Sequence, residues 1–109
     1  MEPPLAEYAY RIQPTRPGML TEGPTEAETA VIERHFAYLK QAMEAGTLLM
    51  AGRTLTTDES SFGIAVFRAE SPEAARRFTE ADPAVREGVM RAEVFPFRVA
   101  LLAERWERG

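Results

Sequence analysis

Near the start of the chain, a hydrophobic pattern that repeats every two residues gives way to one that repeats every three or four. In residues 5–13, Tyr8, Tyr10 and Ile12 alternate with smaller or polar residues, which predicts a β-strand. From residue 25 to about residue 45, apolar residues recur at helical spacing and predict an amphipathic helix. Its apolar face holds Ile32, Phe36, Leu39 and Met43.

The ends of this helix carry residues that helices favour there. Thr25 and Glu28 have the spacing of a capping box, and Gly46 stands where a glycine commonly ends a helix. His35 lies about 60° from the centre of the apolar face, at about 100° per residue. We therefore expect His35 at the margin between core and water, together with Val31, Tyr38 and Ala42.

Two strands, a helix and a last strand follow. Residues 48–53 and 62–67 are predicted strands that form a hairpin. The second helix begins after Ser71, a favourable cap, and ends at Asp82, because the residue before a proline is pushed out of the helical region. A short turn or helix to residue 89 then leads to a strand over residues 93–103.

The order β-α-β-β-α-β predicts a ferredoxin-like α+β fold. One such domain accounts for residues 1–109, with residues 1–4 and 104–109 expected as loose ends. In this topology the last strand is an edge strand, and Pro96 in its middle agrees, because proline cannot donate to a central ladder. The loop over residues 14–24 is long for a strand-to-helix connection, and it is either a functional lid or a floppy insertion.

Apolar residues occupy both faces of the predicted third and last strands. On the third strand, Ile64 and Val66 face one way and Ala65 and Phe67 the other. Two helices cover only one face of a ferredoxin-like sheet, so we expect a second copy to cover the other face in a homodimer of dimeric α/β barrel type with sheet-to-sheet packing. The alternative is that residues 14–24 or the C-terminal tail cover it within one chain.

Composition excludes several classes of function. The net charge is −4 and Lys40 is the only lysine, which argues against a nucleic-acid module. Cysteine is absent, and a single histidine with scattered carboxylates offers no metal-ligand spacing, so we expect no metal. The first residues have neither a basic region nor an apolar run, so we expect no signal peptide, and no apolar run in the sequence is long enough for a membrane span. We expect a cytoplasmic protein that binds neither nucleic acid nor membrane.

The chain resembles the YciI-like (YCII-related) family over about residues 5–102. The stretches that carry the resemblance are His35-Phe36-Ala37-Tyr38-Leu39, Gly46, Leu48, Ala51-Gly52, Phe62-Gly63, Ala81-Asp82-Pro83 and Gly88. The resemblance implies a dimeric ferredoxin-like fold and an active site built from a helix histidine and an aspartate, which match His35 and Asp82 here. Muconolactone isomerases and a dehydrochlorinase share that fold. Arg53 departs from the family, where many members have proline.

A His35–Asp82 pair is chemically sensible. An aspartate that accepts from one ring nitrogen fixes the histidine tautomer and leaves the other nitrogen free for acid–base work near neutral pH. The competing interpretation is purely structural, with His35 as a half-buried helix residue and Asp82 as the cap of a short helix that starts at Pro83.

Four further residues are candidates for substrate binding: Arg53, Tyr38, Gly52 and Ser61. Arg53 ends a strand and has the donor geometry for a carboxylate, although such an arginine is often simply solvated. Tyr38 shares the side of the helix with His35 and either lines a pocket or packs. Ser61 lies in the hairpin without a recognisable base, which favours a role in turn structure.

Three functions remain open. The first is a cofactor-free isomerase, lyase or hydrolase that uses His35 and Asp82 on a small organic acid or lactone. The second is a non-catalytic dimer that binds a metabolite or regulates. The third, with no support beyond His35 itself, is a barrel with haem on that histidine.

Overall fold

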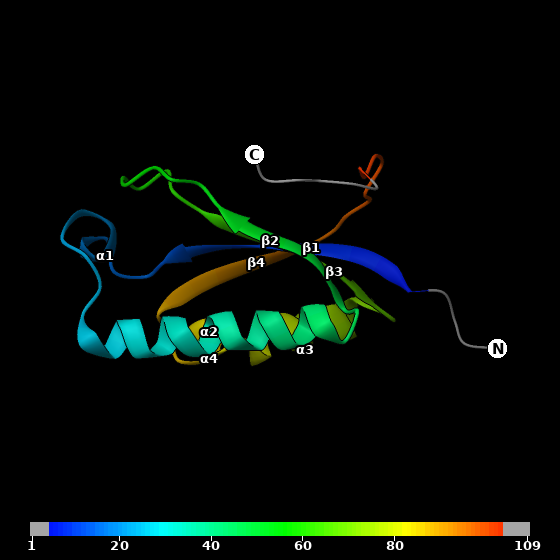
Figure 1. Cartoon of the computed structure of the whole chain (residues 1–109), viewed down its shortest axis with the longest axis horizontal. Coiled ribbons are helices and arrows are strands. Elements are labelled where there is room, and N and C mark those ends of the chain that lie inside the picture. The colour runs from blue at the N-terminus through cyan, green and yellow to red at the C-terminus, as the bar shows by residue number, and fades with distance from the viewer. Residues whose placement is uncertain (1–4, 104–109) are drawn as a thin grey trace.

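The computed structural model describes residues 5–103, and the predicted loose ends lie outside this range. Four antiparallel strands form one sheet in the order β2-β3-β1-β4. Their bounds are β1 Ala6–Pro14, β2 Leu48–Arg53, β3 Gly63–Ala69 and β4 Met90–Pro96. The long helix α2 (Glu26–Glu44) and the shorter α3 (Pro72–Ala81) and α4 (Pro83–Arg86) lie together on one face (Figure 1). This is the predicted ferredoxin-like α+β fold.

Local signals in the sequence set the bounds of α2. The Thr25 side chain accepts from the backbone N–H of Glu28, and the Glu28 side chain accepts from that of Thr25, so the predicted capping box is present. At the other end Gly46 has a φ of 83°, a conformation that L side chains rarely adopt. Residues 14–24 contain a one-turn helix, α1 (Gly18–Thr21), which the sequence did not predict.

The prediction for the face of α2 that enters the core was right for Leu39, which is buried, and wrong for Phe36 and Met43. Phe36 is 69% exposed and Met43 is 55% exposed, whereas Val31 and Ala42 are buried. The helix is therefore turned so that the supposed margin faces the core and the apolar stripe lies beside a cavity described below. The reason lies in α3 and α4, which flank α2 on this side and bury positions that a helix alone on the sheet would leave wet.

The predicted bounds of the last strand were also wrong. It covers Met90–Pro96 instead of residues 93–103, so that Pro96 ends it. Tyr8 pairs with Pro96, and β1 begins only two residues before Tyr8. Little of β1 therefore remains to pair with the chain beyond Pro96. Phe97 N still donates to Glu7 O, whereas Val99 N donates to the Glu7 side chain instead of to a strand. The edge position of β4 is as predicted.

The core lies between the sheet and the helices. Phe67 is fully buried, and its ring centroid lies 4.5 Å from that of Phe78 on α3. Tyr10 from β1 packs against both rings. The opposite face of the sheet has no helix on it among the described residues (Figure 1). Within that range, no helix has both the length and the apolar character needed to cross a membrane.

Candidate active site

His35 projects from the middle of α2 towards α4. Its ring Nδ1 lies 2.7 Å from Asp82 Oδ2 and 2.8 Å from Asp82 Oδ1, and its side chain is 15% exposed. The rotation of α2 described above makes this contact possible, because it turns the His35 side chain inwards. The two residues that the family resemblance implied are therefore in direct contact.

Asp82 is fully buried, at 0% exposure. It occupies the junction where α3 ends and α4 begins, and its Oδ1 accepts from the backbone N–H of Ala84, 2.9 Å away. The sequence left the capping role and the contact with His35 as alternatives, and the structure contains both. Pro83 fixes the first turn of α4, so the backbone holds the carboxyl group in place.

Tyr10 is the member of this cluster that the sequence did not predict as a partner of Asp82. Its hydroxyl donates to Asp82 Oδ2 over 2.6 Å, and the residue is 1% exposed. Burial, with the neighbouring Asp82 charge and hydrogen bond as further causes, raises the pKa of the Tyr10 hydroxyl well above its ordinary range, so that it stays a donor. The one available signal was an apolar strand position filled by a residue whose buried hydroxyl needs a partner.

The cluster sets the proton positions on His35. Tyr10, Ala84 and His35 all point at Asp82, which therefore accepts three hydrogen bonds, the role of an ionised carboxylate. Nδ1 then carries the hydrogen, and in the neutral ring Nε2 keeps its lone pair. An imidazole held in this way can take a proton at Nε2 and later return it.

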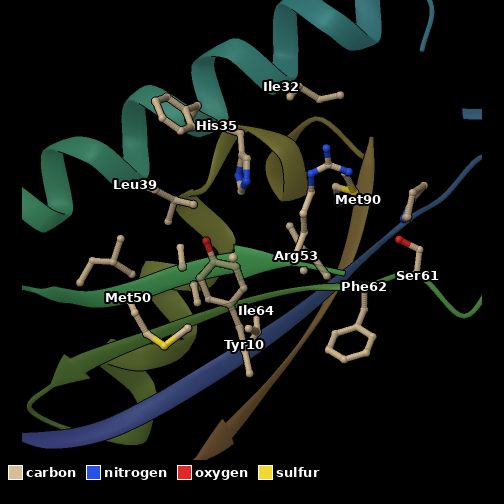
Figure 2. A pocket seen from close by; sticks show the side chains of 18 of the residues that line it. Tyr10, Ile32, His35, Leu39, Met50, Arg53, Ser61, Phe62, Ile64 and Met90 are labelled. Atoms are coloured by element: carbon tan, nitrogen blue, oxygen red, sulfur yellow. The ribbon is translucent and has the colours of Figure 1, made fainter. Parts of the chain in front are cut away.

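A cavity of about 790 Å³ opens between α2, the sheet and the 14–24 loop, and His35 and Tyr10 both line it (Figure 2). Arg53, Gly52 and Ser61, all predicted as substrate-binding residues, also line this cavity. Figure 2 shows the Arg53 side chain rising from the end of β2 into the space beneath α2, as the His35 ring descends into it. Candidate residues from β2, from the connection before β3 and from α2 thus meet around one space.

Tyr38 lies elsewhere. It is not among the residues that line the cavity, and its hydroxyl donates to the Phe78 carbonyl across the contact between α2 and α3, over 2.6 Å. Burial, followed by the negative charge of Asp82, raises the pKa of Tyr38 to about 12. Ser61 is 6% exposed, and its hydroxyl hydrogen-bonds the Thr54 hydroxyl at 3.1 Å. That partner is no base that would activate a nucleophile.

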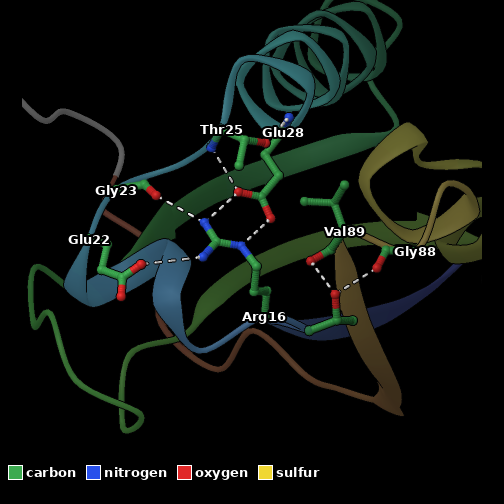
Figure 3. Close-up of polar contacts among 8 residues, drawn as sticks. Arg16, Glu22, Gly23, Thr25, Glu28, Gly88 and Val89 are labelled. Carbon is green, nitrogen blue, oxygen red and sulfur yellow. Dashed lines mark hydrogen bonds and ion pairs between the residues drawn. The ribbon is translucent and has the colours of Figure 1, made fainter.

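The 14–24 loop forms one wall of the cavity through Met19 and Leu20. Figure 3 shows the polar contacts that join this loop to the start of α2 on one side and to Gly88 and Val89, before β4, on the other. The Thr15 hydroxyl donates to the Gly88 carbonyl, and the Arg16 guanidinium donates to both oxygens of Glu28 at 2.8 and 2.9 Å. The Arg16 hydrogen bond, followed by that from the Thr25 backbone, lowers the pKa of Glu28 to about 2. A floppy insertion is a poor description of this segment.

The fold agrees with what known proteins show. The family model of the YCII-related domain matches residues 8–98. The chain belongs to the YCII-related family. None of the curated proteins matches it. Within residues 5–103, no group of three His, Cys, Asp or Glu side chains is arranged to hold a metal ion.

Two solved structures resemble this chain over most of their length. One is a 5-chloro-2-hydroxyhydroquinone dehydrochlorinase from Burkholderia phenoliruptrix in complex with 2,5-dihydroxybenzoquinone, with 24% identity, a TM-score of 0.56, and coverage of 94% of this chain and 95% of that one. The other is a Streptomyces coelicolor monooxygenase bound to nanaomycin D, with 18% identity, a TM-score of 0.42, and coverage of 92% and 94%. The dehydrochlorinase supports the same α+β architecture for this chain.

Proposed function

We propose that the protein is a cofactor-free acid–base enzyme of isomerase, lyase or hydrolase type that acts on an organic acid or lactone. His35 Nε2 takes a proton from the substrate or gives one to it, and Asp82 holds the ring and balances the imidazolium charge. One observation carries the proposal: the His35 ring lines a large cavity while its other nitrogen bonds a fully buried carboxylate. A histidine that lines a large cleft and bonds a buried carboxylate favours a functional site over a packing accident.

Substrate orientation follows from the other lining residues. The planar fork of Arg53 suits a carboxylate, and Gly52 beside it leaves open space where a side chain would stand. Ser61 lines the same region and offers a hydroxyl. An acid held on Arg53 presents its adjacent carbon or its ester bond to His35. Tyr38, outside the cavity, supports the helix that carries His35 instead of touching the substrate.

Proton exchange with heavy water tests the proposed chemistry across a panel of candidate substrates. Isomerisation and elimination both begin by taking a proton from carbon, so the enzyme should exchange substrate C–H for C–D, visible as the loss of a proton NMR signal. A library of small acids, lactones and hydroxylated quinones is suitable, because the structurally similar dehydrochlorinase binds a quinone. Lactone hydrolysis appears in the same spectra. His35→Gln should lower the rate by roughly a hundredfold or more, and equal rates in both proteins would contradict the proposal.

The alternative is a metabolite-binding or regulatory module that uses the same cavity without chemistry. It predicts ligands that bind wild type and His35→Gln alike and exchange no proton in either. The third function raised from the sequence, haem on His35, would use the free Nε2 as the axial ligand, and an absorbance spectrum of the protein tests it. The cytoplasmic location stays a prediction from the sequence.

We further propose that a second copy covers the open face of the sheet. Phe95 is 45% exposed there and Phe97 follows at 43%, whereas Ala9 and Val66 on the same face are each 3% exposed. Glu7 and Arg11 on the same face of β1 make the patch mixed rather than wholly apolar. Beyond β4, Leu101 is 94% exposed and Leu102 is 73% exposed. Apolar side chains gathered at one face favour an interface, and a twofold pair of sheets is the economical way to form one.

A further inference from the structure

The cavity is large for the small organic acids and lactones that the sequence suggested as substrates. Its volume of about 790 Å³ lies in the range of sites for drug-sized ligands. At about 30 Å³ for each water-sized group, it has room for on the order of 25 such groups. A small acid held at His35 would leave most of this space to water in contact with apolar walls, which is unfavourable.

The walls are apolar and rich in methionine. Met19, Met43 and Met90 line the cavity, and they come from α1, α2 and β4 respectively. The chain has five methionines, so three of them converge here from separate elements. Methionine side chains are flexible and polarisable, and they adapt to apolar and aromatic ligands of varied shape. Packing of a core does not explain Met43, which is 55% exposed.

The charged groups at the cavity have one sign. Arg53 and Lys40 line it, and no Asp or Glu is among its lining residues in the described part of the chain. Within residues 5–103, Arg53 also takes part in none of the ion pairs. In Figure 2, Arg53 and Met90 lie towards one end of the cavity and Leu39 towards the other. A ligand with an anionic head and an apolar body matches this distribution of charge and surface.

We propose that the substrate is a large, mainly apolar organic acid of one or more rings. Its anionic group binds Arg53, and its apolar body lies against Met19, Met43 and Met90. The inference narrows the proposed function and rests on it in taking this cavity as the substrate site. Arg53 then determines specificity, because it donates hydrogen bonds to an anionic group. An uncharged molecule of the same shape lacks this main polar contact. His35 lies beside the region where head and body of such a ligand join.

A matched pair of probes tests the proposal: anilinonaphthalene sulfonate, which is anionic, and phenylnaphthylamine, which has a similar ring system without the charge. In protein labelled at the methionine methyl groups, we expect the anion to shift the NMR signals of Met19, Met43 and Met90. We also expect it to shift the ring signals of His35, the only histidine. Arg53→Gln should weaken binding of the anionic probe by roughly tenfold or more, as expected for the loss of a charge-assisted contact. Binding of the neutral probe should weaken by less than about twofold.

Arg11→Gln is the control for binding at the open face, because Arg11 lies on the opposite side of the sheet, and it should leave both affinities unchanged. Unmoved methionine signals, or equal losses for both probes in Arg53→Gln, would overturn the inference. If proton exchange fails while the probes behave as expected, acid–base catalysis is wrong and the ligand class stands. If the probes fail while small acids exchange, the reverse holds.

Discussion

At the scale of single residues, the site is a chain of hydrogen bonds from Tyr10 through Asp82 to His35. The sequence led to His35 and Asp82, because a lone histidine and an Asp-Pro junction are visible in one dimension and match a family pattern. Tyr10 was not predicted as a partner of Asp82, since 72 residues separate them and only the pairing of β1 within the sheet brings them together. Arg53 was predicted as an anion ligand, and its shared cavity with His35 required the fold.

Tyr10→Phe tests whether Tyr10 positions the aspartate. Without this donor, Asp82 Oδ2 has only His35 as a partner, so the Nδ1–H bond strengthens and its proton resonance should move downfield. Tyr38→Phe is the matched control, because it also loses one buried hydroxyl bond but one made to Phe78 O. Each variant should lose about 1–3 kcal/mol of stability. An Nδ1 proton that responds alike in both variants would reduce Tyr10 to packing.

The raised pKa of Tyr38 predicts a loss of stability at alkaline pH. Its folded value of about 12 lies above the ordinary value of 10.0, so the folded state holds the proton more tightly. The resulting stability is fully present below about pH 10 and is lost as the pH rises towards 12. Denaturant unfolding at several alkaline pH values measures this, and Tyr38→Phe should show a shallower decline. A decline that is identical in the two proteins would rule out Tyr38 as its source.

At the scale of elements, capping residues were predictable and helix rotation was not. Thr25, Glu28 and Ser71 act through neighbours within three residues, so their caps could be read from the sequence. The rotation of α2 depends on α3 and α4, which pack beside it only after the chain has crossed the sheet. The same holds for the end of β4 at Pro96, which is set by where β1 begins. Long-range partners overrode local pattern at each of these places.

The ion pair between Arg16 and Glu28 joins the 14–24 loop to α2, and we expect Arg16→Gln to loosen the loop. Hydrogen exchange at the amides of Met19 and Leu20 should become faster, and Arg34→Gln, which breaks the exposed pair with Glu87, should leave those amides unchanged. The lowered pKa of Glu28 adds a pH dependence. This contribution is present above the ordinary value of 4.5 and is lost as the pH falls towards 2. Unchanged exchange in Arg16→Gln would mean that Thr15 alone fixes the loop.

At the scale of the whole molecule, the sheet separates two surfaces with different uses. The helix-covered side holds the cavity and the buried carboxylate, and the open side holds Val66, Phe95 and Phe97. The sequence predicted two apolar faces from the alternation in the third and last strands, and the open face also carries Glu7 and Arg11 from β1. The sequence predicts that the strand continues beyond Pro96. In the structure the chain leaves the sheet there, and Leu101 and Leu102 are exposed.

Phe95→Glu tests the proposed dimer. A carboxylate on the open face would be desolvated against the partner sheet, so we expect sedimentation to show monomers at concentrations where wild type is dimeric. Phe36→Glu is the control, since Phe36 is 69% exposed on α2, away from that face, and should stay dimeric. Wild-type protein that sediments as a monomer at micromolar concentration would contradict the dimer.

The proposed chemistry depends above all on Asp82 holding His35 with the hydrogen on Nδ1 and a free lone pair on Nε2 at the cavity. Nitrogen NMR of the isotope-labelled histidine measures this directly, because the chain has one histidine and the spectrum is unambiguous. We expect a neutral ring protonated at Nδ1 in wild type, and a mixed or reversed tautomer in Asp82→Asn. A wild-type ring protonated at Nε2, or spectra that do not differ between the two proteins, would contradict the proposed role of Asp82.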